Sequence, residues 1–246
     1  MRFCKILLIS LILVLPKSLF GIAGFGLNVI SDGTKLGAYK STETDATSGV
    51  PVTATVESFE MDKLPVGLGG YIFVDFAGWA VEAEVNIAGG EFSFNFGNDL
   101  TDASGNNLTE PLNVPFGWGR LSTAVTVKKN ITDFSIPVLA EAALSAGLGI
   151  NNHTSTPRPS MEMVKGLLPT GVDITEEVNT DLLAAELEDY LMDNLIKSSG
   201  FHAQLGLRFK LLVLDTHLTL RYNLAEDVYD GSSGFAELQL KVGTAF

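Results

Sequence analysis

The carboxy-terminal third of the chain alternates apolar and polar residues at every second position, and this pattern restricts the fold more than any other feature. In residues 214–224 the even positions hold leucine, tyrosine or threonine, whereas the odd positions include Asp215 and Arg221. Residues 201–211 repeat the pattern, with Arg208 on the polar face. A period of two places the two sets of side chains on opposite faces of a β-strand. The chain therefore contains strands that have one largely apolar face.

Earlier segments alternate in the same way, although less cleanly near the amino terminus. The predicted strands are residues 24–30, 66–76, 79–96, 120–127, 134–150, 201–211, 214–224 and 235–246. Gly89 and Gly90 indicate a bulge inside the third of these strands. The orientation of the second strand stays open, because Tyr71 and Phe73 fall on its polar face.

The predicted connections alternate between long and short. The long polar links are residues 31–63, 97–114 and 151–199. The short turns are residues 77–78, 128–133 and 212–214. Such alternation is typical of a transmembrane barrel, which carries long loops at one end and tight turns at the other. We therefore expect an all-β, antiparallel up-and-down barrel, whose strands of about ten residues cross an apolar layer of about 25 Å.

Aromatic residues gather near the predicted strand ends, as they do at the two interfaces of a membrane barrel. Those near the short turns are Phe76, Trp79, Phe134 and Phe246. Those near the long links are Phe94, Phe96, Phe116, Trp118, Phe201 and Tyr222. The alternative is a soluble, secreted barrel of the lipocalin kind, with its apolar face inside around a ligand. That alternative leaves the loop lengths and the two aromatic rims unexplained.

Residues 1–23 have the composition of a cleavable secretory signal. Two basic residues precede an apolar run at residues 6–15, which is too short to span a bilayer as a helix. We expect cleavage after Ala23 and a mature barrel at residues 24–246. The sole cysteine, Cys4, lies in the signal, so the mature chain has no thiol for a disulfide, a metal site or catalysis.

The chain is acidic, with a net charge of −13 at pH 7. Nucleic acid is excluded as a partner, because phosphate binding needs clustered lysine and arginine. We expect no cofactor and no metal site. Asn98, Asp99, Asp102 and Asn106 offer oxygen ligands for calcium, but they lack the spacing of an EF-hand. These residue types are equally typical of exposed turns.

The end of the chain carries a further pattern. Leu238, Leu240 and Val242 place apolar side chains at alternate positions before the terminal Phe246. This resembles the carboxy-terminal signature of outer-membrane β-barrels, which the barrel assembly machinery recognises. The strand number is similar to that of the small barrels typified by the OmpA and OmpX transmembrane domains. The resemblance implies a place in the Gram-negative cell envelope, with outer-membrane lipids and the assembly machinery as partners and with these four residues as the assembly signal.

His153 and Ser155 are the candidates for catalysis. Lipid A deacylases, which are also small barrels, use a His-x-Ser pair, and this tripeptide resembles it. An imidazole at this spacing can activate a hydroxyl on the same strand face. Here the tripeptide follows the predicted strand end and leads into Pro157 and Pro159. We therefore favour an ordinary polar loop and no enzymatic activity.

The link at residues 151–199 is long enough to hold an element of its own. Leucines and Tyr190 recur at helical spacing between acidic residues in residues 180–197, and Thr180 suits the N-cap. We predict a helix there. It either packs on the barrel rim, binds a partner, or forms a lid over a lateral opening for a ligand.

The charged residues of the polar faces are expected inside the barrel. An eight-stranded barrel is only just wide enough for its inward side chains, so ionised groups there must pair. The expected interior network is Glu82, Glu84, Arg120, Glu141, Arg208, Lys210, Asp215, Arg221, Glu237 and Lys241. A network of this kind closes the barrel to ions.

The sequence leaves three classes of function open. We favour a non-catalytic outer-membrane barrel with a structural or interaction role. The alternatives are a porin-like channel or transporter for a small, hydrophobic molecule, and a lipid A-modifying enzyme. Ten strands also stay possible, because residues 35–40 and 52–59 can pair as a hairpin above the membrane or within it. The ligand, the partner and the oligomeric state do not follow from the sequence.

Overall fold

The computed structural model of the protein describes residues 23–45, 52–99, 101, 110–136, 140–167, 187 and 189–246. The predicted signal lies outside these residues except for Ala23, which is the first residue of strand β1. The backbone N–H of Ala23 donates to the carbonyl of Phe246 at 3.0 Å, and the predicted cleavage site stays a prediction. Within the described ranges, no helix is long and apolar enough to cross a membrane.

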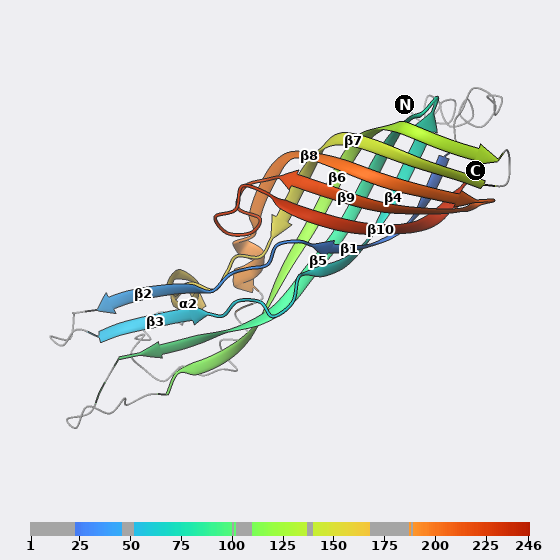
Figure 1. Ribbon diagram of the computed structural model, residues 1–246. Coiled ribbons are helices and arrows are strands. Elements are labelled where there is room, and N and C mark those ends of the chain that lie inside the picture. The colour runs from blue at the N-terminus through green and yellow to red at the C-terminus, as the bar shows by residue number, and fades with distance from the viewer. Residues whose placement is uncertain are drawn as a thin grey trace, which may run out of the picture.

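Eight antiparallel strands close into a ring (Figure 1). Their order around the ring is β1, β4, β5, β6, β7, β8, β9 and β10, and β10 pairs back onto β1. The strands are β1 Ala23–Asp32, β4 Val66–Phe76, β5 Trp79–Asn98, β6 Leu112–Ile136, β7 Ala140–Ser155, β8 Ile196–Leu211, β9 Leu214–Leu224 and β10 Phe235–Ala245. The predicted eight-stranded antiparallel barrel is confirmed.

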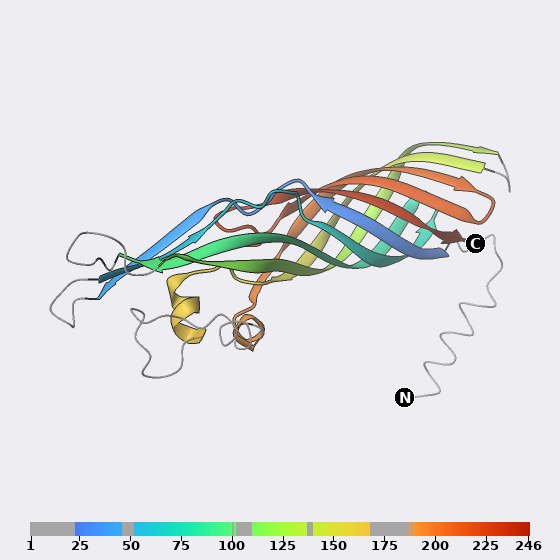
Figure 2. The ribbon, with the colours of Figure 1, turned by 90° about the horizontal axis from the view of Figure 1, so that it is seen from below.

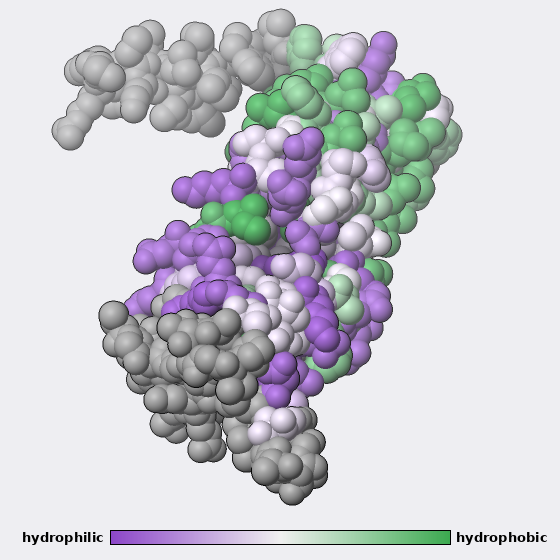
Figure 3. All heavy atoms as spheres, turned by 90° about the vertical axis from the view of Figure 1, so that its left-hand side faces the viewer, coloured by the Kyte–Doolittle hydropathy of each residue, from purple (hydrophilic) through white to green (hydrophobic). Residues whose placement is uncertain are grey.

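The alternation along each strand decides which side chains point outward. Outward residues are apolar and exposed, with Leu27 at 74% and Leu148 at 70%. Inward residues are mostly polar and buried, and on β4 they include Tyr71 and Phe73, which settles the orientation of that strand. Part of the apolar wall is visible in Figure 3. This arrangement is the reverse of a soluble barrel, so the lipocalin-like alternative is wrong. A closed ring with an apolar wall satisfies the condition for crossing lipid, because every backbone group of the ring finds a partner inside the sheet.

The connections confirm most of the predicted alternation. The β4–β5 turn consists of Ala77 and Gly78, both with positive φ (52° and 78°), as a two-residue hairpin of the right twist requires. The predicted turn at residues 128–133 is wrong, because β6 runs through it to Ile136. The polar run there misled the prediction: Lys128 points into the barrel, and the register shifts next to Asn130.

Two strands and parts of two others form a sheet beyond the ring, which we call the extension. Strand β2 (Tyr39–Asp45) pairs with β3 (Val52–Ser58), and β3 pairs with the end of β5, which in turn pairs with the beginning of β6 (Figure 1). The ten-strand alternative for the ring is therefore wrong, and the hairpin lies past the ring. Its first strand begins at Tyr39, about four residues later than predicted. The predicted bulge at Gly89 and Gly90 is absent, because the β5–β6 register is regular there.

The link between β7 and β8 is shorter than predicted, and its described helical residues lie against one face of the extension. Strand β7 continues to Ser155, and β8 begins at Ile196, so the predicted helix cannot reach Lys197. Helix α2 (Met161–Leu167), which the sequence did not predict, lies below the extension in Figure 2. Leu187 and residues 189–193 are helical, while residues 180–186 lie outside the described ranges.

A hydrophobic cluster joins this link to the extension. Its buried members are Ala54, Val56, Phe94, Phe96, Phe116, Met161, Met163, Val164 and Leu167. Leu187, Tyr190 and Leu191 pack against it. The described helical residues of the link thus pack on the extension sheet.

Candidate functional site

A buried ion triad lies at the extracellular mouth of the ring. By the loop-length rule for outer-membrane barrels, the long connections face the medium. Arg120 of β6 donates to both carboxylate oxygens of Asp32 on β1 (2.7 and 2.8 Å) and to Glu237 of β10 (2.8 Å). All three side chains are at most 2% exposed. The triad therefore links three strands at the point where the ring opens toward the extension.

The β9–β10 connection folds over this triad. The hydroxyl of Tyr229 donates to Asp32, and the Tyr229 ring lies 4.7 Å from that of Trp118, centroid to centroid. Burial and the neighbouring Asp32 carboxylate raise the pKa of Tyr229, so this phenol stays protonated and donates. Leu36, Met61 and Phe235 belong to the same buried cluster. An apolar plug thus lies above the ion triad.

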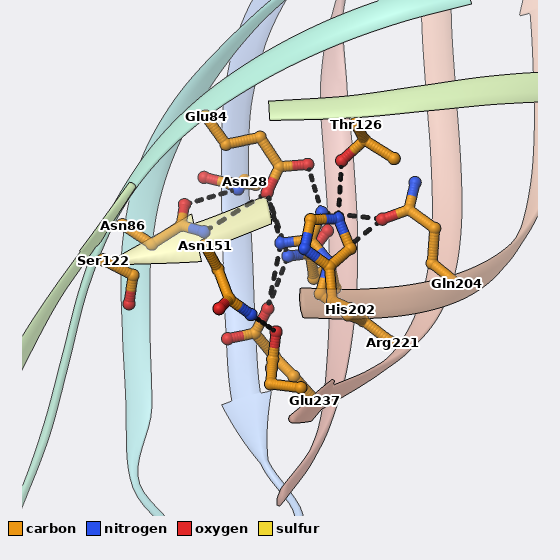
Figure 4. Close-up of polar contacts among 12 residues, drawn as sticks. Asn28, Glu84, Asn86, Ser122, Thr126, Asn151, His202, Gln204, Arg221 and Glu237 are labelled. Carbon is orange, nitrogen blue, oxygen red and sulfur yellow. Dashed lines mark hydrogen bonds and ion pairs between the residues drawn. The ribbon is translucent and has the colours of Figure 1, made fainter. Parts of the chain in front are cut away.

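A bidentate ion pair crosses the middle of the ring (Figure 4). Arg221 of β9 donates to both carboxylate oxygens of Glu84 on β5 at 2.9 and 2.8 Å. The same guanidinium donates to Gln204, and Gln239 bridges Glu84 and Glu237. Two parallel N–H···O bonds between a guanidinium and a carboxylate are the strongest arrangement for this pair.

A second cross-barrel contact lies toward the short-turn end. Glu82 of β5 accepts from Lys128 of the adjacent β6 at 2.6 Å and from Lys241 of β10 at 2.7 Å. Lys241 also donates to Glu84, which connects this group to the Arg221 pair. The lysine nitrogens lie over Phe73 and Tyr71 at 5.8 and 5.4 Å from the ring centroids. These aromatic rings fill the space that the charged groups leave.

A third group of ion pairs, centred on Arg208, lies toward the periplasmic end. Arg208 donates to both oxygens of Asp215 at 2.9 Å and to Asp75 at 3.1 Å, and Glu141 lies 3.6 Å away. His217 contacts Asp215 at 3.1 Å. Charged groups thus line the interior from one mouth of the ring to the other.

Nine of the ten residues expected in the interior take part in these ion pairs. Lys210 is the exception: it is half-buried, and no ion pair joins it to the described carboxylates. Buried residues with polar groups that the prediction left out include Asp32, Asp75, Ser122, Lys128, His153, His202, Gln204, His217, Tyr229 and Gln239. The alternation of the strands could have identified several of them. Asp32 continues the inward phase of Asn28 two residues beyond the predicted strand end.

His153 and Ser155 lie in strand β7, so their placement in a flexible link was wrong. Both side chains are buried and point into the ring. The His153 Nδ1 atom lies 3.1 Å from Ser122 and 3.1 Å from Arg120. A lipid substrate outside the wall meets the opposite face of this strand. The tripeptide therefore contributes to the interior packing.

The aromatic rim is real at one end and partly wrong at the other. At the short turns, Phe76, Trp79, Phe134 and Phe246 are all exposed on the wall. At the long-loop end, Phe201 and Tyr222 are exposed too. The remaining four expected rim residues are buried. Phe94, Phe96 and Phe116 belong to the hydrophobic cluster of the extension, and Trp118 belongs to the apolar plug around Tyr229. They follow the inward phase of strands that extend past the membrane.

The second face of the extension is open and polar. Threonine and asparagine side chains pair across its strands: Thr44 and Thr53 lie 3.1 Å apart, and Asn113 donates to Asn95 at 2.8 Å. A hollow of about 430 Å³ lies on this face between β2, β3 and β5. Hydrophilic residues dominate the coloured atoms in the lower half of Figure 3, away from the apolar wall. We call this face the open face.

The residues considered for calcium are only partly described. Asp99 accepts a hydrogen bond from the backbone N–H of Thr53 at 2.6 Å, whereas Asp102 and Asn106 lie outside the described ranges. Among the described histidines, cysteines and acids, no group of three or more is arranged to hold a metal ion.

Comparison with known proteins gives only distant structural likeness. No family model matches the sequence, and neither does any curated protein. The structure of Ail, the attachment invasion locus protein of Yersinia pestis, in complex with the heparin analogue sucrose octasulfate, has a TM-score of 0.41 at 9% identity, covering 92% of this chain and 99% of that chain. The amino-terminal β-barrel domain of Pseudomonas aeruginosa OprF gives 0.28 at 14% identity, covering 91% and 99%. Neisserial surface protein A gives 0.34 at 12% identity, covering 92% and 97%.

Three structural features show that the protein is a β-barrel surrounded by lipid. A closed antiparallel ring, an apolar outer wall and an ion-paired interior belong together only where the surrounding medium is lipid. Short turns at one end and long connections at the other are those of barrels from the bacterial outer membrane. The chain is therefore a small transmembrane β-barrel of the outer-membrane type.

Proposed function

We propose that the protein is a non-catalytic anchor in the outer membrane that presents the extension to the medium as an interaction surface. The observation that carries this proposal is the contrast between the two faces of the extension. One face is covered by α2 and the β7–β8 link, while the open face has no covering element among the described residues. The barrel interior is occupied by its own ion pairs, so the surface for a partner lies outside the ring.

The chemistry of the open face favours a partner that forms hydrogen bonds and carries no dense negative charge. Thr42, Thr53, Thr55 and Asn95 line its hollow, together with one cation, Lys40, and two carboxylates, Glu57 and Asp99. The chain carries 29 acidic against 16 basic side chains, and the interior groups nearly balance, so the acidic surplus lies outside the ring. A polyanion such as the heparin analogue named with Ail would be repelled here. We therefore propose an extracellular protein or an unsulfated glycan as the partner.

Substitution on the open face tests the proposal. Thr55→Arg places a long cation in the hollow, next to its cross-strand neighbour Thr42. Cells that display the protein are compared with cells that lack it on immobilised matrix proteins and on sulfated and unsulfated polysaccharides. We expect retention by the native protein on a protein or an unsulfated glycan, and at least tenfold weaker retention with Thr55→Arg.

The matched control adds the same charge elsewhere outside the membrane. Ser233 is exposed on the β9–β10 connection, which contributes no residue to the hollow of the open face, so Ser233→Arg should retain native binding. Equal loss with both variants, or retention only on sulfated polysaccharide, would overturn the proposal.

The channel and lipid A alternatives gain no support from the contacts described above. A channel needs a continuous aqueous path, whereas charged pairs and the Tyr229 plug occupy the interior. A lipid-modifying site needs catalytic groups on the lipid side, whereas His153 points inward.

A further inference from the structure

The apolar wall of the barrel contains a groove that described residues line. Its volume is about 690 Å³, and it runs obliquely from the beginning of β5 across β6, β7, β8 and β9 to β10. The groove arises because short and long side chains alternate along a cross-strand row. Leu148, Ala203, Tyr222 and Ala236 are successive partners in this row, so the two alanines leave hollows between longer neighbours.

The lower end of the groove carries a cation. Lys129 and Trp79 are cross-strand partners that line this end, and Trp79 follows directly on the β4–β5 turn. The Lys129 ammonium lies 5.0 Å from the centroid of the Trp79 ring. Its side chain is exposed on the wall, and no described carboxylate forms an ion pair with it. A lysine and a tryptophan together are typical of the interface between acyl chains and headgroups.

We propose that this groove is a binding site for one phospholipid of the periplasmic leaflet. An acyl chain lies in the groove over Ala146 and Ala203, and the lipid phosphate pairs with Lys129. The position of the cation decides between the two leaflets. Lipopolysaccharide carries its phosphates at the long-loop end, whereas Lys129 lies near the short turns. The proposal is independent of the role of the extension.

Native mass spectrometry of the full-length barrel with added phosphatidylglycerol tests the site. Ala203→Trp fills the groove, and Lys129→Gln removes the cation while leaving the groove open. We expect the native protein to retain one lipid that Ala203→Trp loses. Lys129→Gln should weaken retention about fivefold, which corresponds to about 1 kcal/mol for one lysine at an anionic lipid surface.

The control variant is Ala83→Trp. Ala83 points outward on β5 between Ile72 and Val125, and it does not line the groove. It should retain the lipid, and heat-modifiable migration checks that all variants are folded. Equal retention in the two tryptophan variants would overturn the proposal, and so would a preference for lipid A over phosphatidylglycerol. A dimer that Ala203→Trp abolishes would assign the groove to a second copy of the chain instead.

Discussion

Arg221 and Glu84 form an ion pair across the full width of the barrel. Nη1 of Arg221 donates to Oε2 of Glu84 at 2.9 Å, and Nη2 donates to Oε1 at 2.8 Å. Their strands, β9 and β5, lie four places apart in a ring of eight. The pair therefore links opposite walls. The Arg120–Glu237 contact above it also joins strands four places apart, and the Lys241–Glu82 contact below it joins strands three places apart. Ion pairs inside the barrel therefore connect strands on different sides of a wall whose outer face contacts lipid.

Removing the arginine of this pair alone should lower the free energy of unfolding. Arg221→Met leaves Glu84 and Glu237 with fewer cations, and losing one partner of a buried pair costs about 3–5 kcal/mol. We expect a lower temperature for the heat-modified shift in electrophoresis. The double variant Arg221→Met/Glu84→Met removes both charges and should recover part of the loss. Strict additivity of the two single effects would contradict a direct coupling.

Detaching α2 should expose the covered face of the extension without affecting the ring. Val164 is fully buried against the extension, so Val164→Asp places a carboxylate in an apolar contact at a cost of several kcal/mol. Limited proteolysis should cut the β7–β8 link at least tenfold faster, with unchanged heat-modified migration. Glu162→Gln alters an exposed residue of the same helix and should behave as the native protein. Loss of the folded barrel in Val164→Asp would contradict the independence of the two parts.

Deletion of Phe246 should impair assembly. The ring of Phe246 meets that of Phe25 on β1 edge-on at 6.1 Å between centroids, and this contact is retained after the predicted cleavage behind Ala23. The residue thus closes the β1–β10 seam as well as ending the predicted assembly signal. We expect unfolded protein in the periplasm and several-fold less in the membrane. Normal amounts of inserted, heat-modifiable protein would refute both roles.

The double variant His153→Ala/Ser155→Ala should leave the lipid A of the host unchanged. Both side chains face the interior, where His153 lies within 3.1 Å of Ser122 and Arg120. We expect a reduced thermal midpoint from lost packing and the native lipid A acylation pattern by mass spectrometry. Loss of one deacylated product in the variant would show that the protein is an enzyme.

The ring could be predicted because lipid imposes a period of two on every strand that it surrounds. Leu218 and Arg221 already show their opposite faces in the printed sequence. The extension could not be placed in the same way, since past the membrane both faces of a strand meet either water or protein. Phe94 and Phe116 therefore resembled an interfacial rim while they form a core.

Strand ends were the other limit. Lys128 looked like a turn residue because a lysine is expected near water, and only the position of Glu82 on the neighbouring strand explains its burial. His153 looked like a loop residue for the same reason. Cross-barrel partners such as Asp32 and Arg120 are 88 residues apart, and the strand pattern alone does not show which inward groups meet.

A barrel that its own side chains close should not conduct ions, and single-channel recording in planar bilayers measures this conductance. Ion pairs line the ring from Arg208 to Arg120, and Tyr229 lies over the upper mouth. The native protein should show no steady conductance above the bare-membrane baseline, and Arg221→Met should give at most brief openings. A stable, large conductance from the native protein would contradict the closed barrel and favour a channel.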